Sequence, residues 1–160
     1  MTVTNTPKQP LKVGDTIPAF SLQDQNGQWF NSDEVIGKQP VIIYFYPKDE
    51  TPGCTKEACK FRDEFEVFTD LNARVIGISS DNVASHKKFA EKYHLPFTLL
   101  ADVNKKVRQL FGVPKSTLGL LPGRVTYIIN NKGVVIYIFN SQFKAEKHID
   151  KAIEVLRRDS

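Results

Sequence analysis

Cysteine is scarce in this chain, and its scarcity limits what the chain can be. Only two cysteines, Cys54 and Cys59, occur in 160 residues. Two are too few for a disulfide scaffold, and a structural bridge between such close neighbours would constrain little of the entropy of the unfolded chain. Close cysteine pairs in a reducing compartment are typical of redox chemistry or of metal binding.

Further zinc ligands are also scarce. A zinc site takes about four ligands at compact spacing, whereas the two cysteines are accompanied by three scattered histidines, His86, His94 and His148. We interpret each histidine as solvated or partly packed, and we expect no metal site.

Long apolar runs and blocks of one charge are absent. No apolar stretch approaches the ~20 residues needed to cross a bilayer, so membrane insertion is not expected. Lys and Arg number 22 against 18 Asp and Glu, a net charge of +4 that is spread along the chain. Without a basic block, the sequence does not favour a nucleic-acid surface.

The chain also lacks internal repeats, low-complexity tracts and linkers. We therefore expect a single domain over residues 1–160, with a flexible segment over about residues 1–9. The first 15 residues contain neither the apolar segment nor the cleavage site of a secretory signal. A cytoplasmic location is expected, although a mature plastid protein would look the same.

Apolar periodicity predicts an alternation of strands and helices. The turn-forming dipeptide Asn26-Gly27 and the later turn Asn131-Lys132-Gly133 each predict an antiparallel hairpin. The predicted strands cover residues 20–22, 29–30, 41–46, 74–79, 97–100, 125–130 and 133–139; the predicted helices follow residue 54, cover 83–93 and 105–111, and end the chain with Ile149, Ala152, Ile153 and Leu156 on the core face.

One helix is predicted from the positions of five residues. Cys54, Ala58, Phe61, Phe65 and Phe68 recur at spacings of four and three, which marks a single apolar helix face that includes Cys54. The βαβ order in the first part of the chain predicts parallel strands, and a ββα part follows. This order is that of an α/β thioredoxin-like fold, with a central mixed sheet flanked by helices, an N-terminal hairpin extension and an inserted strand and helix.

Cys54 is the candidate nucleophile because of its position. A loop containing Pro and Gly leads from a buried strand into the predicted helix, so Cys54 lies in the first helical turn. Backbone N–H groups in that turn lack intrahelical partners, and the helix dipole is positive there. Both effects favour a thiolate over a neutral thiol, and the thiolate is the reactive form of cysteine.

The spacing of the two cysteines predicts a conformational change. In a regular helix a five-residue offset gives a Cα separation of about 8.6 Å, whereas a disulfide tolerates no more than about 7 Å. If Cys54 and Cys59 form a redox pair, the first turns of the helix must unwind before the two sulfurs can bond.

The segment YFYPKDETPGCTKEAC resembles the active-site segment of the peroxiredoxins, specifically the PrxQ or bacterioferritin comigratory protein group. Pro47, Thr51 and Cys54 supply the Pro-x-x-x-Thr-x-x-Cys pattern, and a second cysteine follows five residues later. The resemblance extends from VGDTIPAFSL near the start to FGVPKSTLGLLPGRVTYII.

The resemblance implies a role for each of five residues. Cys54 would be the peroxidatic cysteine and Cys59 the resolving one, joined in an intramolecular disulfide. Thr51 would hydrogen-bond the peroxide and the thiolate, Pro47 would shield the thiolate from water, and Arg124 would lie over it.

Two further residues are assigned supporting roles. Gly53 allows close approach of the backbone, and its amide can donate to the substrate. Glu57 lies one turn beyond Cys54 and resembles the family's residue that orients the arginine. Lys48 and Asp49 either order this loop or are solvated loop charges.

The implied activity is reduction of hydrogen peroxide or organic hydroperoxides, with thioredoxin or a thioredoxin-like protein as reductant. The resemblance implies no metal or organic cofactor, and a monomer is expected because the resolving cysteine is in the same chain. A thioredoxin-like disulfide oxidoreductase is the first alternative, but Thr51 occupies the first position of its Cys-x-x-Cys motif. A redox sensor that shares these residues without turnover is the second.

Overall fold

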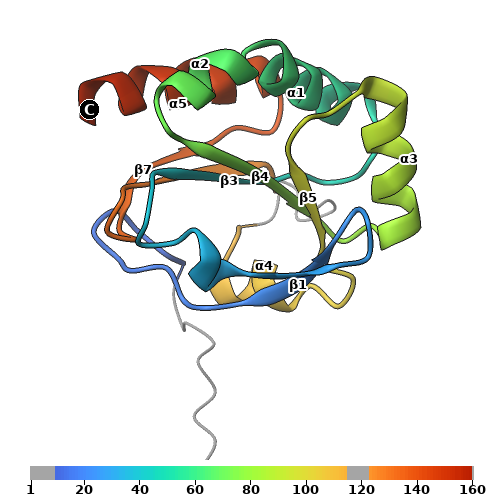
Figure 1. The fold of residues 1–160 in the computed structure, drawn as a ribbon, viewed down its shortest axis with the longest axis horizontal. Coiled ribbons are helices and arrows are strands. Elements are labelled where there is room, and N and C mark those ends of the chain that lie inside the picture. Colours follow the sequence, from blue (N-terminus) through green and yellow to red (C-terminus); the bar gives the residue numbers. More distant parts are fainter. Residues whose placement is uncertain (1–9, 115–122, 160) are drawn as a thin grey trace, which may run out of the picture.

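The described part of the chain, residues 10–114 and 123–159 of the computed structural model, forms a seven-stranded mixed sheet with helices on both faces (Figure 1). The flexible segment expected over residues 1–9 lies outside the described residues. The strands are β1 (Ser21–Asp24), β2 (Trp29–Asn31), β3 (Val41–Phe45), β4 (Arg74–Ser79), β5 (Thr98–Ala101), β6 (Val125–Ile129) and β7 (Val135–Asn140). The helices are the 3-10 turn η1 (Ser32–Glu34), α1 (Pro52–Asp63), α2 (Phe65–Asp70), α3 (Val83–Tyr93), α4 (Lys106–Phe111) and α5 (Ala145–Asp159).

The strand order is β2-β1-β5-β4-β3-β6-β7. Strands β3, β4 and β5 are parallel, as the βαβ alternation predicts, and β6 and β7 form the predicted antiparallel hairpin beside β3. The N-terminal hairpin joins the sheet through the β1–β5 pair. The predicted thioredoxin-like architecture is therefore confirmed, with β1–β2 as the extension and β5–α4 as the insertion.

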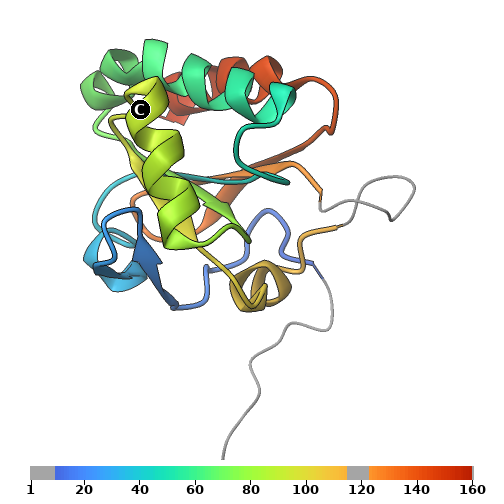
Figure 2. The ribbon, with the colours of Figure 1, turned by 90° about the vertical axis from the view of Figure 1, so that its right-hand side faces the viewer.

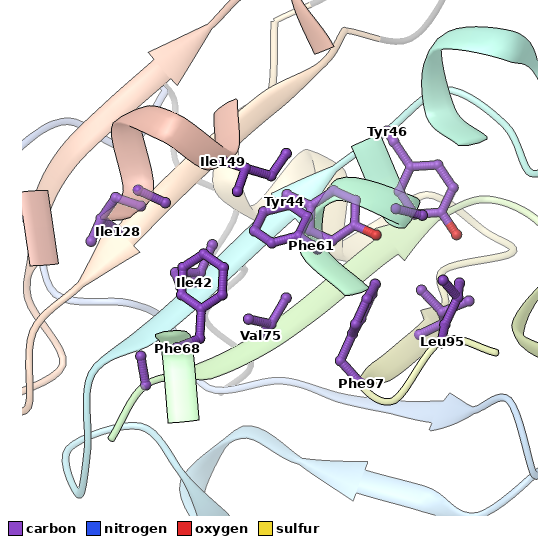
Figure 3. Close-up of a cluster of buried hydrophobic side chains, with 14 of the residues drawn as sticks. Ile42, Tyr44, Tyr46, Phe61, Phe68, Val75, Leu95, Phe97, Ile128 and Ile149 are labelled. Atoms are coloured by element: carbon purple, nitrogen blue, oxygen red, sulfur yellow. The ribbon is translucent and has the colours of Figure 1, made fainter. Parts of the chain in front are cut away.

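Strand β3 lies inside the sheet between β4 and β6 and is buried on both faces. Its side chains alternate, so Ile42 and Tyr44 join the core cluster beneath α1, α2, α3 and α5, while Val41, Ile43 and Phe45 join the cluster on the α4 side. Figure 2 shows the two helical layers from the side, and Figure 3 shows the first cluster. The double burial explains why this strand reads as an unbroken apolar run.

The prediction of a single helix from Cys54 to Phe68 was wrong in one respect. The helix is interrupted at Glu64, which has a non-helical ψ of 10°. Helix α1 therefore ends at Asp63, and α2 begins at Phe65. Cys54 and Phe68 are nonetheless both buried in the same cluster. Periodicity could not reveal the break because both helices contribute to one continuous apolar face.

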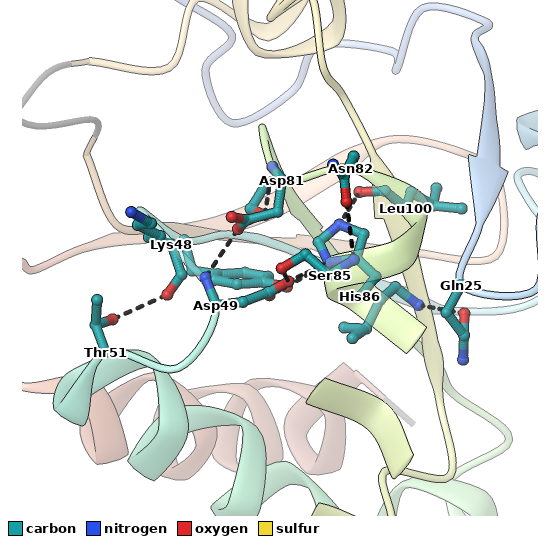
Figure 4. Close-up of polar contacts among 12 residues, drawn as sticks. Gln25, Lys48, Asp49, Thr51, Asp81, Asn82, Ser85, His86 and Leu100 are labelled. Carbon is teal, nitrogen blue, oxygen red and sulfur yellow. Dashed lines mark hydrogen bonds and ion pairs between the residues drawn. The ribbon is translucent and has the colours of Figure 1, made fainter. Parts of the chain in front are cut away.

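The loop between β3 and α1 is fixed by a buried carboxylate (Figure 4). Asp49 Oδ1 accepts a hydrogen bond from the Tyr46 hydroxyl at 2.6 Å, and Oδ2 accepts one from the Ser85 hydroxyl at 2.8 Å. The Asp49 amide donates to Asp81 Oδ2 at 2.8 Å. The sequence left open whether Lys48 and Asp49 order this loop or are solvated charges. Asp49 is buried and orders the loop, whereas Lys48 is exposed.

His86 completes this anchor, and its expected solvation was wrong because it is fully buried. Its Nε2 lies 2.9 Å from the Leu100 carbonyl oxygen, and its Nδ1 lies 2.8 Å from Asp49 Oδ2. The His86 ring therefore bridges the Asp49 carboxylate and the Leu100 carbonyl oxygen. The contact between Asp49 and His86 joins the loop before α1 to helix α3.

The Tyr46 hydroxyl should matter to stability, whereas the Tyr44 hydroxyl should not. Both rings are buried on β3, but the Tyr44 hydroxyl has no hydrogen-bond partner within the described residues. We expect Tyr46→Phe to lower the free energy of unfolding by about 1–3 kcal/mol, because a hydrogen bond to a buried carboxylate is lost. Tyr44→Phe is the matched control and should be neutral or slightly stabilising in urea denaturation. Equal losses of unfolding free energy in the two variants would contradict a stabilising role for the hydrogen bond between Tyr46 and Asp49.

Candidate active site

Cys54 is the third residue of α1 and is 1% exposed. Thr51 caps the helix start with extended backbone, and Pro52 occupies the first turn, where its missing N–H costs nothing. Cys54 therefore lies in the first turn of the helix, as the sequence predicts. Both cysteines are free thiols in this structure.

Arg124 lies beside the sulfur, although the two residues are 70 positions apart. Its Nη2 donates to Cys54 Sγ at 3.3 Å. The β3–β6 register explains the contact: Phe45 pairs with Val125, so Arg124 lies opposite the point where the chain leaves β3 toward the cysteine. Arg124 is 3% exposed, which keeps water from screening its charge.

Every nitrogen of the Arg124 guanidinium has a partner. Nη1 donates to Glu57 Oε1 at 2.6 Å, and Nε donates to the Gln142 carbonyl oxygen at 3.2 Å. With two nitrogens held in this way, the planar group can direct only Nη2 toward Cys54. Glu57 thus contacts Arg124, and the orienting role expected for it stays a prediction.

Gly53 is the residue over which Arg124 passes. A Cβ atom at this position would lie 2.9 Å from Nη2, closer than a side chain tolerates. The lack of a side chain therefore leaves room for the guanidinium at the helix start. The approach of the Gly53 backbone to a substrate stays a prediction.

Glu57 is fully buried, and burial raises its pKa to about 8 against the opposing effect of the Arg124 charge. Its second oxygen, Oε2, has no hydrogen bond within the described residues and lies 3.6 Å from His148 Nδ1. This carboxyl group is held by Arg124 on one side only.

His148 was missed as a site residue, and its expected solvation was wrong because it is fully buried. Its Nε2 donates to the Ser141 carbonyl oxygen at 2.8 Å, so Nδ1 accepts from the Thr126 hydroxyl at 2.7 Å. Burial lowers the pKa of His148 to about 4, which leaves the ring neutral near pH 7. The sequence signal was its place one residue before Ile149 on the apolar face of α5. His94, in contrast, is exposed as expected.

The Thr51 hydroxyl does not contact Cys54 in this structure. It donates to the Lys48 carbonyl oxygen at 2.9 Å and closes a local turn. Pro47 is half-buried and lies two residues after the end of β3. The structure therefore brings together Cys54, Arg124, Glu57 and Gly53, while Thr51 and Pro47 belong to the segment that precedes α1.

Cys59 lies in the same uninterrupted helix and is half-buried. Burial raises the pKa of the Cys59 thiol, with Asp63 adding to the effect and Arg62 opposing it. The five-residue helical spacing that prevents a disulfide is present in this form of the protein.

One group within residues 10–114 and 123–159 has the composition of a metal site. Ligand atoms of Asp49, Asp81 and His86 lie within 4.8 Å of one another. They are already hydrogen-bonded to each other and to Tyr46, Ser79, Ser85 and the Leu100 carbonyl oxygen. We assign them to the loop anchor and not to a metal. None of the helices in the described ranges has the length and apolar character of a membrane span.

Sequence comparisons connect this site to a known family. The model of the AhpC/TSA family matches residues 13–138. A chloroplastic peroxiredoxin Q from Populus jackii is 51% identical over 155 residues, which cover 97% of this chain and 72% of the relative. A chloroplastic peroxiredoxin Q from Triticum aestivum is 54% identical over 147 residues, 92% of this chain and 67% of the relative.

Solved structures agree with these matches. Peroxidoxin BcpB from Mycobacterium tuberculosis is 39% identical with a TM-score of 0.86, over 94% of this chain and 99% of the other. A peroxiredoxin Q mutant from Xanthomonas campestris is 29% identical with a TM-score of 0.79, over 88% of this chain and 92% of the other. The chain therefore belongs to the AhpC/TSA family of thiol peroxidases and, within it, to the peroxiredoxin Q group.

Proposed function

We propose that the chain reduces hydroperoxides with Cys54, closes a disulfide between Cys54 and Cys59, and is returned to the dithiol by thioredoxin or a thioredoxin-like protein. The observation that carries the proposal is the 3.3 Å contact between Cys54 Sγ and Arg124 Nη2 at the start of α1. A buried guanidinium and a helix N-terminus together favour the thiolate that peroxide reduction requires.

In the first step, the Cys54 thiolate attacks the terminal oxygen of ROOH. An S–O bond forms, the O–O bond breaks, and the leaving alkoxide takes a proton to give ROH, so Cys54 becomes a sulfenic acid. Arg124 and the amides of Gly53 and Cys54 supply donors fixed before the reaction, where charge moves onto the leaving oxygen.

Thr51 and Pro47 keep the roles predicted for them as part of this proposal. The Thr51 hydroxyl is at the helix cap, and rotation about one side-chain bond would exchange its hydrogen bond to Lys48 for one to the bound peroxide. Pro47 presents a ring without an N–H donor at the end of β3, which suits it to exclude water from the thiolate.

In the second step, α1 unwinds at its start, and the Cys59 thiol condenses with the sulfenic acid to give a disulfide and water. We place the limits of the unwinding segment at two fixed points of the fold. Asp49 is fixed upstream by His86, and Phe61 is fully buried downstream. Between them, Glu50 has a left-handed φ of 64°, and Thr51 makes no side-chain capping bond. Both features lower the stability of the first turn.

In the third step, an external dithiol protein reduces the disulfide and is itself oxidised. We propose that the protein acts as a single-domain monomer, because both redox cysteines belong to one helix. A compartment that maintains reduced thioredoxin is required, either the cytoplasm or a plastid. The chloroplastic relatives support a plastid location.

Serine variants separate the two cysteines. We expect Cys54→Ser to reduce peroxide consumption to the uncatalysed rate, because no sulfur remains at the helix start. Cys59→Ser should consume one equivalent of peroxide, give a sulfenic acid that can be trapped at Cys54, and lose thioredoxin-coupled turnover. The measurements are peroxide consumption and mass spectrometry after sulfenic-acid trapping. Persistent peroxidase activity in Cys54→Ser would rule out the mechanism, and a redox sensor would show the trapped sulfenic acid without turnover in the wild type.

Oxidation should unfold a bounded segment. Amide hydrogen exchange is expected to lose protection over about residues 51–60 when the disulfide forms, because the helical separation of the cysteines exceeds disulfide length. Amides of β3 and of α3 near His86 should keep their protection, since the Asp49 anchor lies outside the segment. Cys59→Ser treated with peroxide is the control that is oxidised without a disulfide. Unchanged protection over α1 in the disulfide form would contradict the unwinding step.

A further inference from the structure

A second guanidinium is buried near the reacting cysteine, on the opposite side of the sheet from α1. Arg108 in α4 is 8% exposed. Its Nη2 donates to the Tyr46 carbonyl oxygen at 3.0 Å, and its Nη1 donates to the Gly123 carbonyl oxygen at 3.1 Å. The guanidinium carbon lies 5.5 Å from the centre of the Phe45 ring.

The two carbonyl groups belong to the residues that directly precede the site. Tyr46 precedes Pro47, and Gly123 precedes Arg124. Because β3 and β6 are antiparallel neighbours, the segment that follows β3 lies beside the segment that enters β6. The fork of Arg108 therefore links the loop that leads to Cys54 with the residue that donates to its sulfur.

The start of α4 holds the backbone of Arg108 in place. Asp102 is 2% exposed, and its carboxylate accepts the backbone N–H groups of Val107 at 3.1 Å and Arg108 at 2.8 Å. A fixed backbone and a planar fork leave little freedom to the two carbonyl groups that Arg108 binds.

The charge of Arg108 also acts on the site. Within the described residues its side-chain donors bind neutral carbonyl oxygens and form no ion pair within 4.0 Å. Burial lowers the pKa of Arg108, while the charge of Asp102 and, when they are ionised, the charges of Tyr127 and Cys54 oppose that effect. A cation in this setting is stabilised when Cys54 is a thiolate, and by reciprocity it favours the thiolate.

Other titratable groups facing Cys54 do not replace this cation. Glu57 on α1 and Tyr44 on β3 contribute negative charge when ionised, and Arg124 contributes the direct hydrogen bond. Arg108 is thus the second buried cation that interacts with the sulfur.

We propose that Arg108 is a positioning residue for peroxide reduction: its fork fixes the segments of Pro47 and Arg124 relative to each other, and its charge supports that of Arg124 in favouring the Cys54 thiolate. This role rests on the proposed function of the site. In this role Arg108 does not touch the substrate. It acts through Tyr46, through Gly123 and through its electrostatic field.

The test compares Arg108→Met with Arg108→Lys in a Cys59→Ser background, where Cys54 is the single thiol. Lysine keeps the charge but lacks the planar fork, so the pair separates the two effects. Arg74→Met is the matched control, because Arg74 is half-buried over a phenylalanine ring, Phe30 at 5.7 Å, but lies at the start of β4, away from the site. The readouts are the pH dependence of Cys54 alkylation by iodoacetamide and the rate constant of the reaction with hydrogen peroxide.

Arg108→Met should move the alkylation midpoint upward by about 0.5 pH unit or more and slow the peroxide reaction at least about tenfold. Arg108→Lys should keep the midpoint near that of the wild type and still slow the peroxide reaction, and Arg74→Met should change neither. An unchanged alkylation midpoint in folded Arg108→Met would overturn the proposal, and so would an unchanged peroxide rate constant in Arg108→Lys. If Arg108→Met does not fold, the peroxide rate constant of Arg108→Lys decides. If the background protein does not react with peroxide at all, the proposed function fails, while the alkylation profile still reports the effect of the Arg108 charge.

Discussion

The contact between the Arg124 guanidinium and the Cys54 sulfur is the interaction on which this structure depends. It joins a helix start to the neighbouring strand and requires a glycine at position 53, a buried carboxyl group at Glu57 and the Gln142 carbonyl oxygen to hold the arginine. None of these groups is reactive in itself. In the proposed function these groups together favour the thiolate form of Cys54 in a site that water scarcely reaches, where fixed charges act most strongly.

In the proposed cycle this site has to open once per turnover, and the fold offers a fixed point on either side of it. The contact between Asp49 and His86 and the hydrogen bonds of Asp49 fix the chain before α1, and the aromatic cluster around Phe61 fixes it afterwards. The intervening turn has a left-handed residue and an incomplete cap. In that proposal Glu57 lies in the segment that unwinds, so Arg124 would lose its partner when the helix opens, and re-forming their hydrogen bond would help to restore the active geometry after reduction.

Much of this could be predicted from the sequence, because the relevant signals are local. The apolar run of β3, the turn at Asn26-Gly27 and the helix entry at Cys54 predicted the order of elements, and the family resemblance carried by the segment around Cys54 implied the roles of Arg124 and Glu57. Contacts between distant segments could not be predicted in this way. His86, His148 and Arg108 have no unusual local sequence, and they become buried polar groups only when α3, α5 and α4 pack on the sheet. The break at Glu64 escaped detection for a related reason, since the apolar face continues across it.

Direct measurement of the Cys54 thiolate tests the central claim. The ultraviolet absorbance of the thiolate can be titrated with pH in the reduced Cys59→Ser protein and in the same protein carrying Arg124→Met. The account predicts that the thiolate persists to markedly lower pH when Arg124 is present, by about one pH unit or more, with far-ultraviolet circular dichroism unchanged. Coincident titration curves for the two folded proteins would show that Arg124 does not stabilise the thiolate, and the proposed basis of the activity would be wrong.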